Sequence, residues 1–98
     1  MGEALIVKAA WIYENALQQA LAIAEFPVEA RLSAFKTVIH QFVRNFNILD
    51  RYNGFIETME REEIYDAGVN LLNLARDQYS LVMTDEEFMT VFDENRDW

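Results

Sequence analysis

Hydrophobic residues recur at intervals of three and four positions along most of the chain, which is the spacing that places them on one face of an α-helix. This period breaks at Pro27, at Asn53-Gly54 and over the stretch from Ser80 to Thr84. Four helical segments remain between these breaks. Their expected bounds are about 3–25, 28–51, 58–82 and 85–95.

The first segment carries a wide apolar face. Alanine, leucine and glutamine, which favour helix formation, dominate its composition. The broad face holds Leu5, Ala9, Ile12, Tyr13, Ala16, Leu17, Ala20, Ile23 and Ala24. Lys8, Asn15 and Gln18 lie opposite, and Trp11 falls among them. A face this wide predicts that the helix contacts two or more neighbours.

The second segment is the most strongly patterned. Pro27 stands in its first turn, where the missing N–H costs no helical hydrogen bond, and Asn53-Gly54 ends it. Its apolar stripe comprises Val28, Leu32, Phe35, Val38, Ile39, Phe42, Val43, Phe46 and Leu49. The opposite face carries the basic side chains Lys36, His40, Arg44 and Arg51.

The last two segments have recognisable starts. Thr58 can cap the third, and Thr84 with Glu87 forms a capping box before the fourth. The inner face of the third segment comprises Ile64, Gly68, Leu71, Leu72, Ala75, Tyr79 and Val82. A glycine on such a face predicts that another backbone passes close to it. The fourth segment has a short apolar face of Phe88, Val91 and Phe92.

These elements predict one all-α domain over residues 1–98, an antiparallel bundle of three long helices plus one short C-terminal helix. The short helix folds across the bundle or packs on a second copy. Because the chain has no cysteine, disulfide-stapled, zinc-finger and thiol-catalysis interpretations are excluded.

The overall charge argues against some classes of binding partner. Seventeen acidic and 8 basic side chains give a formal net charge of −9. This argues against direct nucleic-acid binding, which needs basic groups to neutralise phosphates, and against an anionic membrane surface. No uncharged run reaches the ~20 residues of a membrane span. Lys8 interrupts the apolar stretch Ala4–Tyr13, which argues against a signal peptide. We therefore expect a cytoplasmic protein.

The excess of acidic over basic side chains lies entirely in the second half of the chain. Residues 1–52 hold five acids and five bases, whereas residues 53–98 hold twelve acids and three bases. One interpretation is solubility together with favourable helix starts, because many of these acids stand in first turns. The other is a surface that docks on a basic protein and steers its approach.

No pattern of residues favours catalysis, a cofactor or a metal. His40 is the only histidine and has no Ser, Cys or acid at helical spacing to work with. The acids from Glu60 to Asp66 lack the Glu-x-x-His pattern of di-iron bundles. The acidic run from Asp93 lacks the glycine of a calcium loop. We therefore predict a non-enzymatic chain without cofactor or metal.

Aromatic anchors within a charged rim are typical of protein-binding surfaces. Trp11 falls on a polar face, and Trp98 follows an acidic helix. The candidate partner-binding residues are Trp11, Glu60, Glu63, Asp85, Glu86, Asp93, Glu94 and Trp98. The alternative is that Trp11 packs under the fourth helix and Trp98 closes the base of the bundle.

Two functions follow from these features. The first is a small acidic inhibitor or regulator of a basic protein that handles nucleic acids or acts as a toxin. Its size and charge are in the range of bacteriocin immunity proteins and phage-encoded inhibitors, an analogy of class that rests on no residue motif. The alternative is an assembly subunit that forms a homodimer through the apolar faces of the first two helices.

Overall fold

The computed structural model describes residues 3–54, 56 and 58–98, and it confirms the all-α prediction. Helix α1 spans Glu3–Ala22 and continues into a 3-10 turn, η1, at Ile23–Glu25. Helices α2, α3 and α4 span Val28–Asn53, Thr58–Tyr79 and Asp85–Glu94. None of the described residues lies in a β-strand. The side chains of Leu5 and Thr58 lie outside the described part of the structure.

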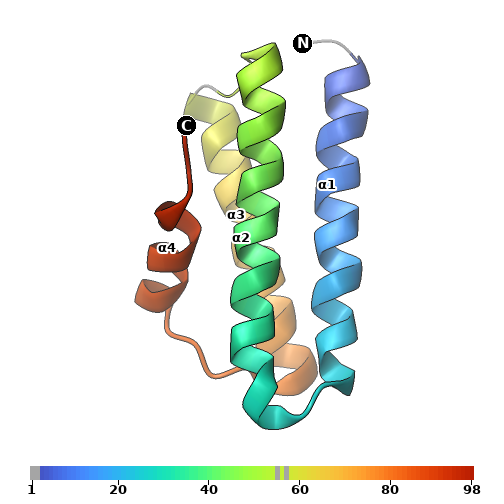
Figure 1. Cartoon of the computed structure of the whole chain (residues 1–98), viewed down its shortest axis with the longest axis vertical. Helices are drawn as coiled ribbons and strands as arrows, with labels where there is room; N and C mark the ends of the chain where they lie inside the picture. Colours follow the sequence, from blue (N-terminus) through green and yellow to red (C-terminus); the bar gives the residue numbers. More distant parts are fainter. Residues whose placement is uncertain (1–2, 55, 57) are drawn as a thin grey trace.

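The three longer helices stand lengthwise beside one another (Figure 1), and the molecule measures 40 × 24 × 17 Å. Helix α2 occupies the middle, with α1 on one side, α3 behind it and α4 on the side away from α1. The central helix can therefore be covered on several sides at once. Figure 1 also shows the chain reversing direction from each long helix to the next.

The core is built around the apolar stripe of α2. Its fully buried members are Phe35, Ile39, Phe42 and Val43. Leu71, Leu72 and Ala75 of α3 meet them from one side, and α1 and η1 contribute smaller residues. These buried residues of α1 and η1 are Ile12, Ala16, Ala20 and Ile23. Because two of them are alanines, the backbone of α1 can approach its neighbours closely.

The predicted caps are confirmed at the end of α2 and at the start of α4. Gly54 ends α2 in the left-handed conformation, with φ of 58°, and its N–H donates to the Asp50 carbonyl oxygen. The Thr84 hydroxyl accepts a hydrogen bond from the Glu87 N–H at 3.1 Å. The Glu87 carboxylate accepts one in return from the Thr84 N–H, which completes the capping box.

The end of α3 differs from the prediction. The helix stops at Tyr79 rather than near residue 82, and Val82 is 86% exposed instead of facing the core. Leu81 and Met83 on either side of it are buried. This alternation has the period of an extended segment, in which successive side chains point to opposite sides. Over these few positions the hydrophobic residues of the linker also fit the spacing of a helical stripe, which is why the sequence pattern predicted a longer helix.

The close approach at Gly68 is confirmed, but the neighbour is not a backbone. A Cβ atom at this position would lie 3.1 Å from the ring edges of both Phe88 and Phe92 of α4. Tyr65, three positions earlier on α3, meets the Phe92 ring edge to face at 5.3 Å. The glycine therefore makes room for the aromatic side chains that hold α4 against α3.

Ser80 adopts a conformation that favours glycine. It has a φ of 54°, and its N–H donates to the Arg76 carbonyl oxygen at 3.1 Å while the Leu81 N–H donates to that of Ala75 at 3.3 Å. The Ser80 bond is the one that closes a helix in the αL motif, in which the residue after the helix is left-handed. A side chain at such a position costs free energy that glycine avoids.

We expect Ser80→Gly to raise the free energy of unfolding by about 0.5–1 kcal/mol. Ser80→Ala is the control, because it keeps a Cβ atom in the left-handed conformation and should bring no gain. Denaturant unfolding of the three proteins measures the difference. Equal stability of the glycine and alanine variants would contradict the prediction.

Tyr79 joins the end of α3 to α1. Its hydroxyl donates to the Ala20 carbonyl oxygen at 2.9 Å, and its side chain is buried. The Arg31 guanidinium lies 5.8 Å from the centre of the ring and donates to the carbonyl oxygens of Ala24 and Phe26. Burial raises the pKa of Tyr79 to about 12, and the positive charge of Arg31 opposes that rise.

The raised pKa makes stability fall at alkaline pH. Between 10.0 and about 12 the folded protein keeps the Tyr79 proton that the unfolded chain loses, so the free energy of unfolding decreases as the pH rises. We expect Tyr79→Phe to flatten this decline. Denaturant unfolding from about pH 9 upward measures it, with Tyr13→Phe as the control. The control phenol has no hydrogen-bond partner among the described residues. The same pH dependence in the Tyr79→Phe variant and the wild type would refute the assignment.

Candidate functional site

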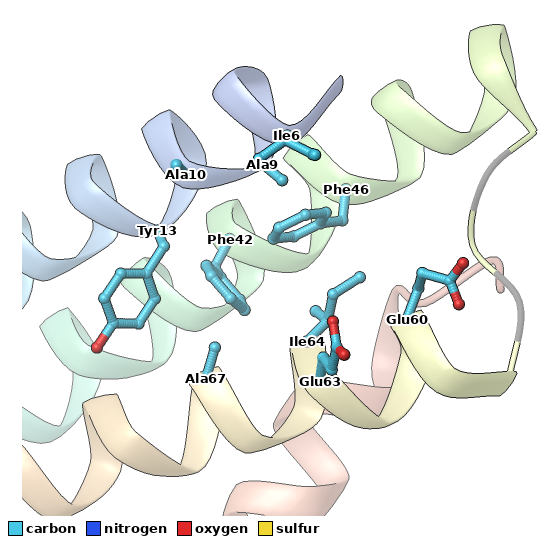
Figure 2. A pocket seen from close by; sticks show the side chains of 10 residues that line it. All are labelled: Ile6, Ala9, Ala10, Tyr13, Phe42, Phe46, Glu60, Glu63, Ile64 and Ala67. Carbon is cyan, nitrogen blue, oxygen red and sulfur yellow. The ribbon is translucent and has the colours of Figure 1, made fainter. Parts of the chain in front are cut away.

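An apolar groove of about 280 Å³ lies between α1 and α3 and is the best candidate for a functional site. Figure 2 shows side chains of α1 along one wall, side chains of α3 along the other, and two phenyl rings of α2 between them. The lining residues are Ile6, Ala9, Ala10, Tyr13, Phe42, Phe46, Glu60, Glu63, Ile64 and Ala67. We call this site the α1–α3 groove.

Small side chains on both walls keep the groove open. Ala9 and Ala10 stand on the α1 wall and Ala67 on the α3 wall, so neither helix fills the space between them. The floor is rigid by comparison. Phe42 and Phe46 pack edge to face, with ring centres 5.1 Å apart, and expose 1% and 3% of their surfaces. The floor belongs to the core, whereas the walls range from exposed Ile6 to buried Ile64.

Two carboxylates form one edge of the groove. Glu60 is half-buried and Glu63 is exposed, and both come from the first turns of α3. Neither has an ion-pair partner among the described residues. We call these two residues the acidic rim. The positive end of the α3 dipole favours the negative charge of Glu60, which stands in the first turn of α3.

Helix α1 also carries exposed apolar side chains outside the groove. Ile6 lines the groove, and Val7 and Trp11 follow on the outer side of α1. The exposed fractions of these three side chains are 56%, 65% and 63%. Val7 and Trp11 are four positions apart, so they lie next to each other on the helix. We call these three residues the apolar ridge. Contiguous exposed hydrophobic residues of this kind often mark a contact surface.

The candidate partner-binding residues divide into two separate groups. Trp11 of α1 and the acidic rim of α3, Glu60 and Glu63, form the first group, of which only the rim lines the α1–α3 groove. The other five belong to α4 and the residues after it, which lie on the far side of α2 from α1 (Figure 1). Because α4 lies there, it does not cover Trp11. The sequence does not distinguish these two groups, because their separation depends on where α4 packs.

Most of the acids on α4 are paired within the chain. Asp85 contacts Arg76 at 3.1 Å, Asp93 contacts Arg96 at 3.2 Å, and Glu94 contacts His40 at 3.0 Å. Glu86 is exposed and has no ion pair in the part of the chain that the structure describes. Trp98 is half-buried, with its ring 5.9 Å from that of Phe92 and Arg96 over its face. This region is therefore held mainly by intramolecular contacts.

The acidic C-terminal residues contact the basic face of α2. His40 is half-buried against Glu94 rather than freely exposed, and Arg51 contacts Asp97 at 3.6 Å. Asn47 is the buried polar residue between them. Its amide donates to the Asn95 carbonyl oxygen and accepts from the Asp97 N–H, so both ends of the side chain hold the backbone after α4.

Sequence reasoning missed Ile6, Ala10 and Phe42 as parts of a site. The signal was the wide apolar face of the first helix, which predicted two or more neighbours. Helices α2 and α3 do contact α1. They leave the outer side of its first turns uncovered, as the exposure of Val7 shows. Two residues of that wide face, Ala9 and Tyr13, line the groove.

No group of three acidic or histidine side chains among the described residues is placed to hold a metal ion. None of their helices combines the length and hydrophobicity that crossing a membrane requires. Comparison of the chain with models of protein families, with curated proteins and with solved structures finds no match. The site must therefore be interpreted from its own geometry.

The Asn47 contacts predict how firmly the end of the chain is held. We expect Asn47→Ala to lower the free energy of unfolding by about 1–3 kcal/mol, because it leaves two backbone polar groups without partners. Asn73→Ala is the control, since this asparagine is exposed on α3 and makes no side-chain hydrogen bond in the described structure. Denaturant unfolding measures both. Equal losses would show that Asn47 does not anchor the segment.

Proposed function

We propose that the chain is a non-enzymatic protein-interaction module, a small acidic inhibitor or regulator that docks on a basic protein. In this proposal it is an antiparallel bundle of three long helices with a short fourth helix across it. The docking surface is the α1–α3 groove with its acidic rim and apolar ridge. A protein that handles nucleic acids, or a toxin, is the expected class of partner, because such proteins present basic surfaces.

The observation that carries the proposal is the meeting of unpaired carboxylates with uncovered apolar side chains. Glu60 and Glu63 face no base among the described residues, whereas Asp85, Asp93 and Glu94 each have one. An apolar centre with a charged rim is the usual composition of a protein interface. The centre supplies affinity when it is buried, and the rim supplies orientation.

The net charge of the chain supports the same function. With a formal charge of −9, the molecule attracts a basic partner before contact is made. At the acidic rim this attraction coincides with exposed hydrophobic surface, because Glu60 and Glu63 line the same groove as Ile6. Association of this kind is fast and weakens as salt is added.

Charge reversal on the acidic rim tests the proposal. The variant is E60K/E63K, and the control is E25K/D77K, which changes the net charge equally at the ends of η1 and α3, outside the groove. Both control carboxylates are exposed and have no ion pair within the described residues. Each tagged protein is used for capture from a lysate of the source organism, with elution by rising salt and identification by mass spectrometry.

We expect the wild type and the control to retain a basic protein that elutes between roughly 0.1 and 0.5 M salt, where the screening length falls from ~10 Å towards a few Å. The rim variant should lose it. Retention by the rim variant, or equal loss from rim variant and control, would refute the proposed surface.

Homo-oligomerisation is the second candidate function, and the exposed apolar ridge favours it. In this case α1 would pack on another copy of the chain, and the acidic residues would serve as solvated surface. Recovery of the chain alone from the capture experiment, as a dimer that resists salt, would support assembly in place of partner binding.

A further inference from the structure

We propose that the occupant of the α1–α3 groove is a short amphipathic helix of the partner. This helix would place an aliphatic anchor in the groove and two Lys or Arg side chains against the acidic rim. The inference rests on the proposed docking function and adds the kind of element that docks. It follows from the spacing of the carboxylates, the chemistry of the walls and the charge of the chain.

The spacing of the acidic rim matches a helix. Glu60 and Glu63 are three positions apart on α3, which is a rise of about 4.5 Å along one side. Basic side chains three or four positions apart on a partner helix have a similar spacing. Alternate residues of an extended strand stand about 6.6 Å apart or more. A helix lying along α3 can therefore offer one basic group to each carboxylate.

The walls of the groove suit an aliphatic anchor. Ile6 and Ala10 line the α1 wall, Ala67 lines the α3 wall, and the Phe42 ring lies beneath them (Figure 2). The volume of about 280 Å³ lies just under the ~300–1,000 Å³ of small-molecule pockets. The groove also has its carboxylates at one edge. It therefore suits side chains presented by a partner.

The charge of the chain argues against a second copy as the occupant. Two-fold docking would bring together two copies that carry the same net charge. Each chain already carries a formal charge of −9, and like charges oppose association at close range. A basic helix neutralises the rim. Charge complementarity therefore selects a foreign, basic segment.

A model peptide tests the inference with the intact chain. The probe is a fluorescein-labelled peptide of about 15 residues, made of Leu, Lys and Ala with Leu and Lys at helical spacing. The first comparison peptide has the same composition in strict alternation. The second replaces every Lys by Glu. Fluorescence anisotropy gives the Kd of each peptide.

Substitutions in the chain locate the binding. E60Q/E63Q removes the charge of the rim, and Ala10→Phe fills the groove without changing any charge. The controls are E25Q/D77N and Ala22→Phe, which lie at the ends of α1, η1 and α3, outside the groove. Ala10 and Ala22 are both exposed, so both phenylalanines can be accommodated without disturbing the core. Circular dichroism confirms that each variant is folded.

The inference predicts that the helical Leu/Lys peptide binds at least about tenfold more tightly than the alternating and Leu/Glu peptides. E60Q/E63Q and Ala10→Phe should each weaken its binding by about tenfold, and the controls should leave it unchanged. Equal binding of the helical and alternating peptides would overturn the inference. So would binding that Ala10→Phe leaves intact, because the groove would then not hold the anchor.

The docking function and the helical occupant can be refuted separately. If E60K/E63K abolishes capture of a basic protein but the helical peptide does not bind, the docking function stands and the helical occupant is wrong. If capture is insensitive to the acidic rim and the peptide also fails, both are wrong.

Discussion

Burial of Phe42 and Phe46 against the neighbouring helices is the contact on which the rest of this structure depends. The two rings pack edge to face, at 5.1 Å between centres, and are almost completely shielded from solvent. Removing a buried phenyl ring typically costs about 3–5 kcal/mol. Because these rings also form the floor of the α1–α3 groove, the core and the site share one set of atoms.

The uneven distribution of charge acquires a structural explanation once α4 is in place. The basic face of α2 pairs with the acidic end of the chain, through His40 with Glu94 and Arg51 with Asp97. Exposed pairs of this kind contribute little stability individually, about 0–1 kcal/mol each. The buried Asn47 and the aromatic contacts of Phe88 and Phe92 with the Gly68 region position the segment more firmly. Charge segregation in the sequence therefore partly reflects how α4 packs.

The acidic rim is different because no such partner faces it within the described structure. Glu60 stands where the positive end of the α3 dipole stabilises it, and both Glu60 and Glu63 lie next to side chains that water solvates poorly. An exposed apolar surface invites association without selectivity. Carboxylates at its edge oppose association with other acidic surfaces, including further copies of the chain, and favour basic ones. The groove thus combines a source of affinity with a means of discrimination.

The sequence by itself determined the helices, because capping residues and the spacing of hydrophobic positions act locally. Gly54, Thr84 and Glu87 end or begin their helices as their chemistry predicts. The stripe of α2 became the core for the same reason. Val82 was misplaced because an extended linker with alternate buried residues imitates a helical face over a few positions. Tertiary structure alone decided that α4 packs on the side of α2 away from Trp11, and that Glu60 and Glu63 border a groove while Asp85 and Glu94 are paired. A helical period shows which side chains share a face, but only packing decides which neighbour covers that face.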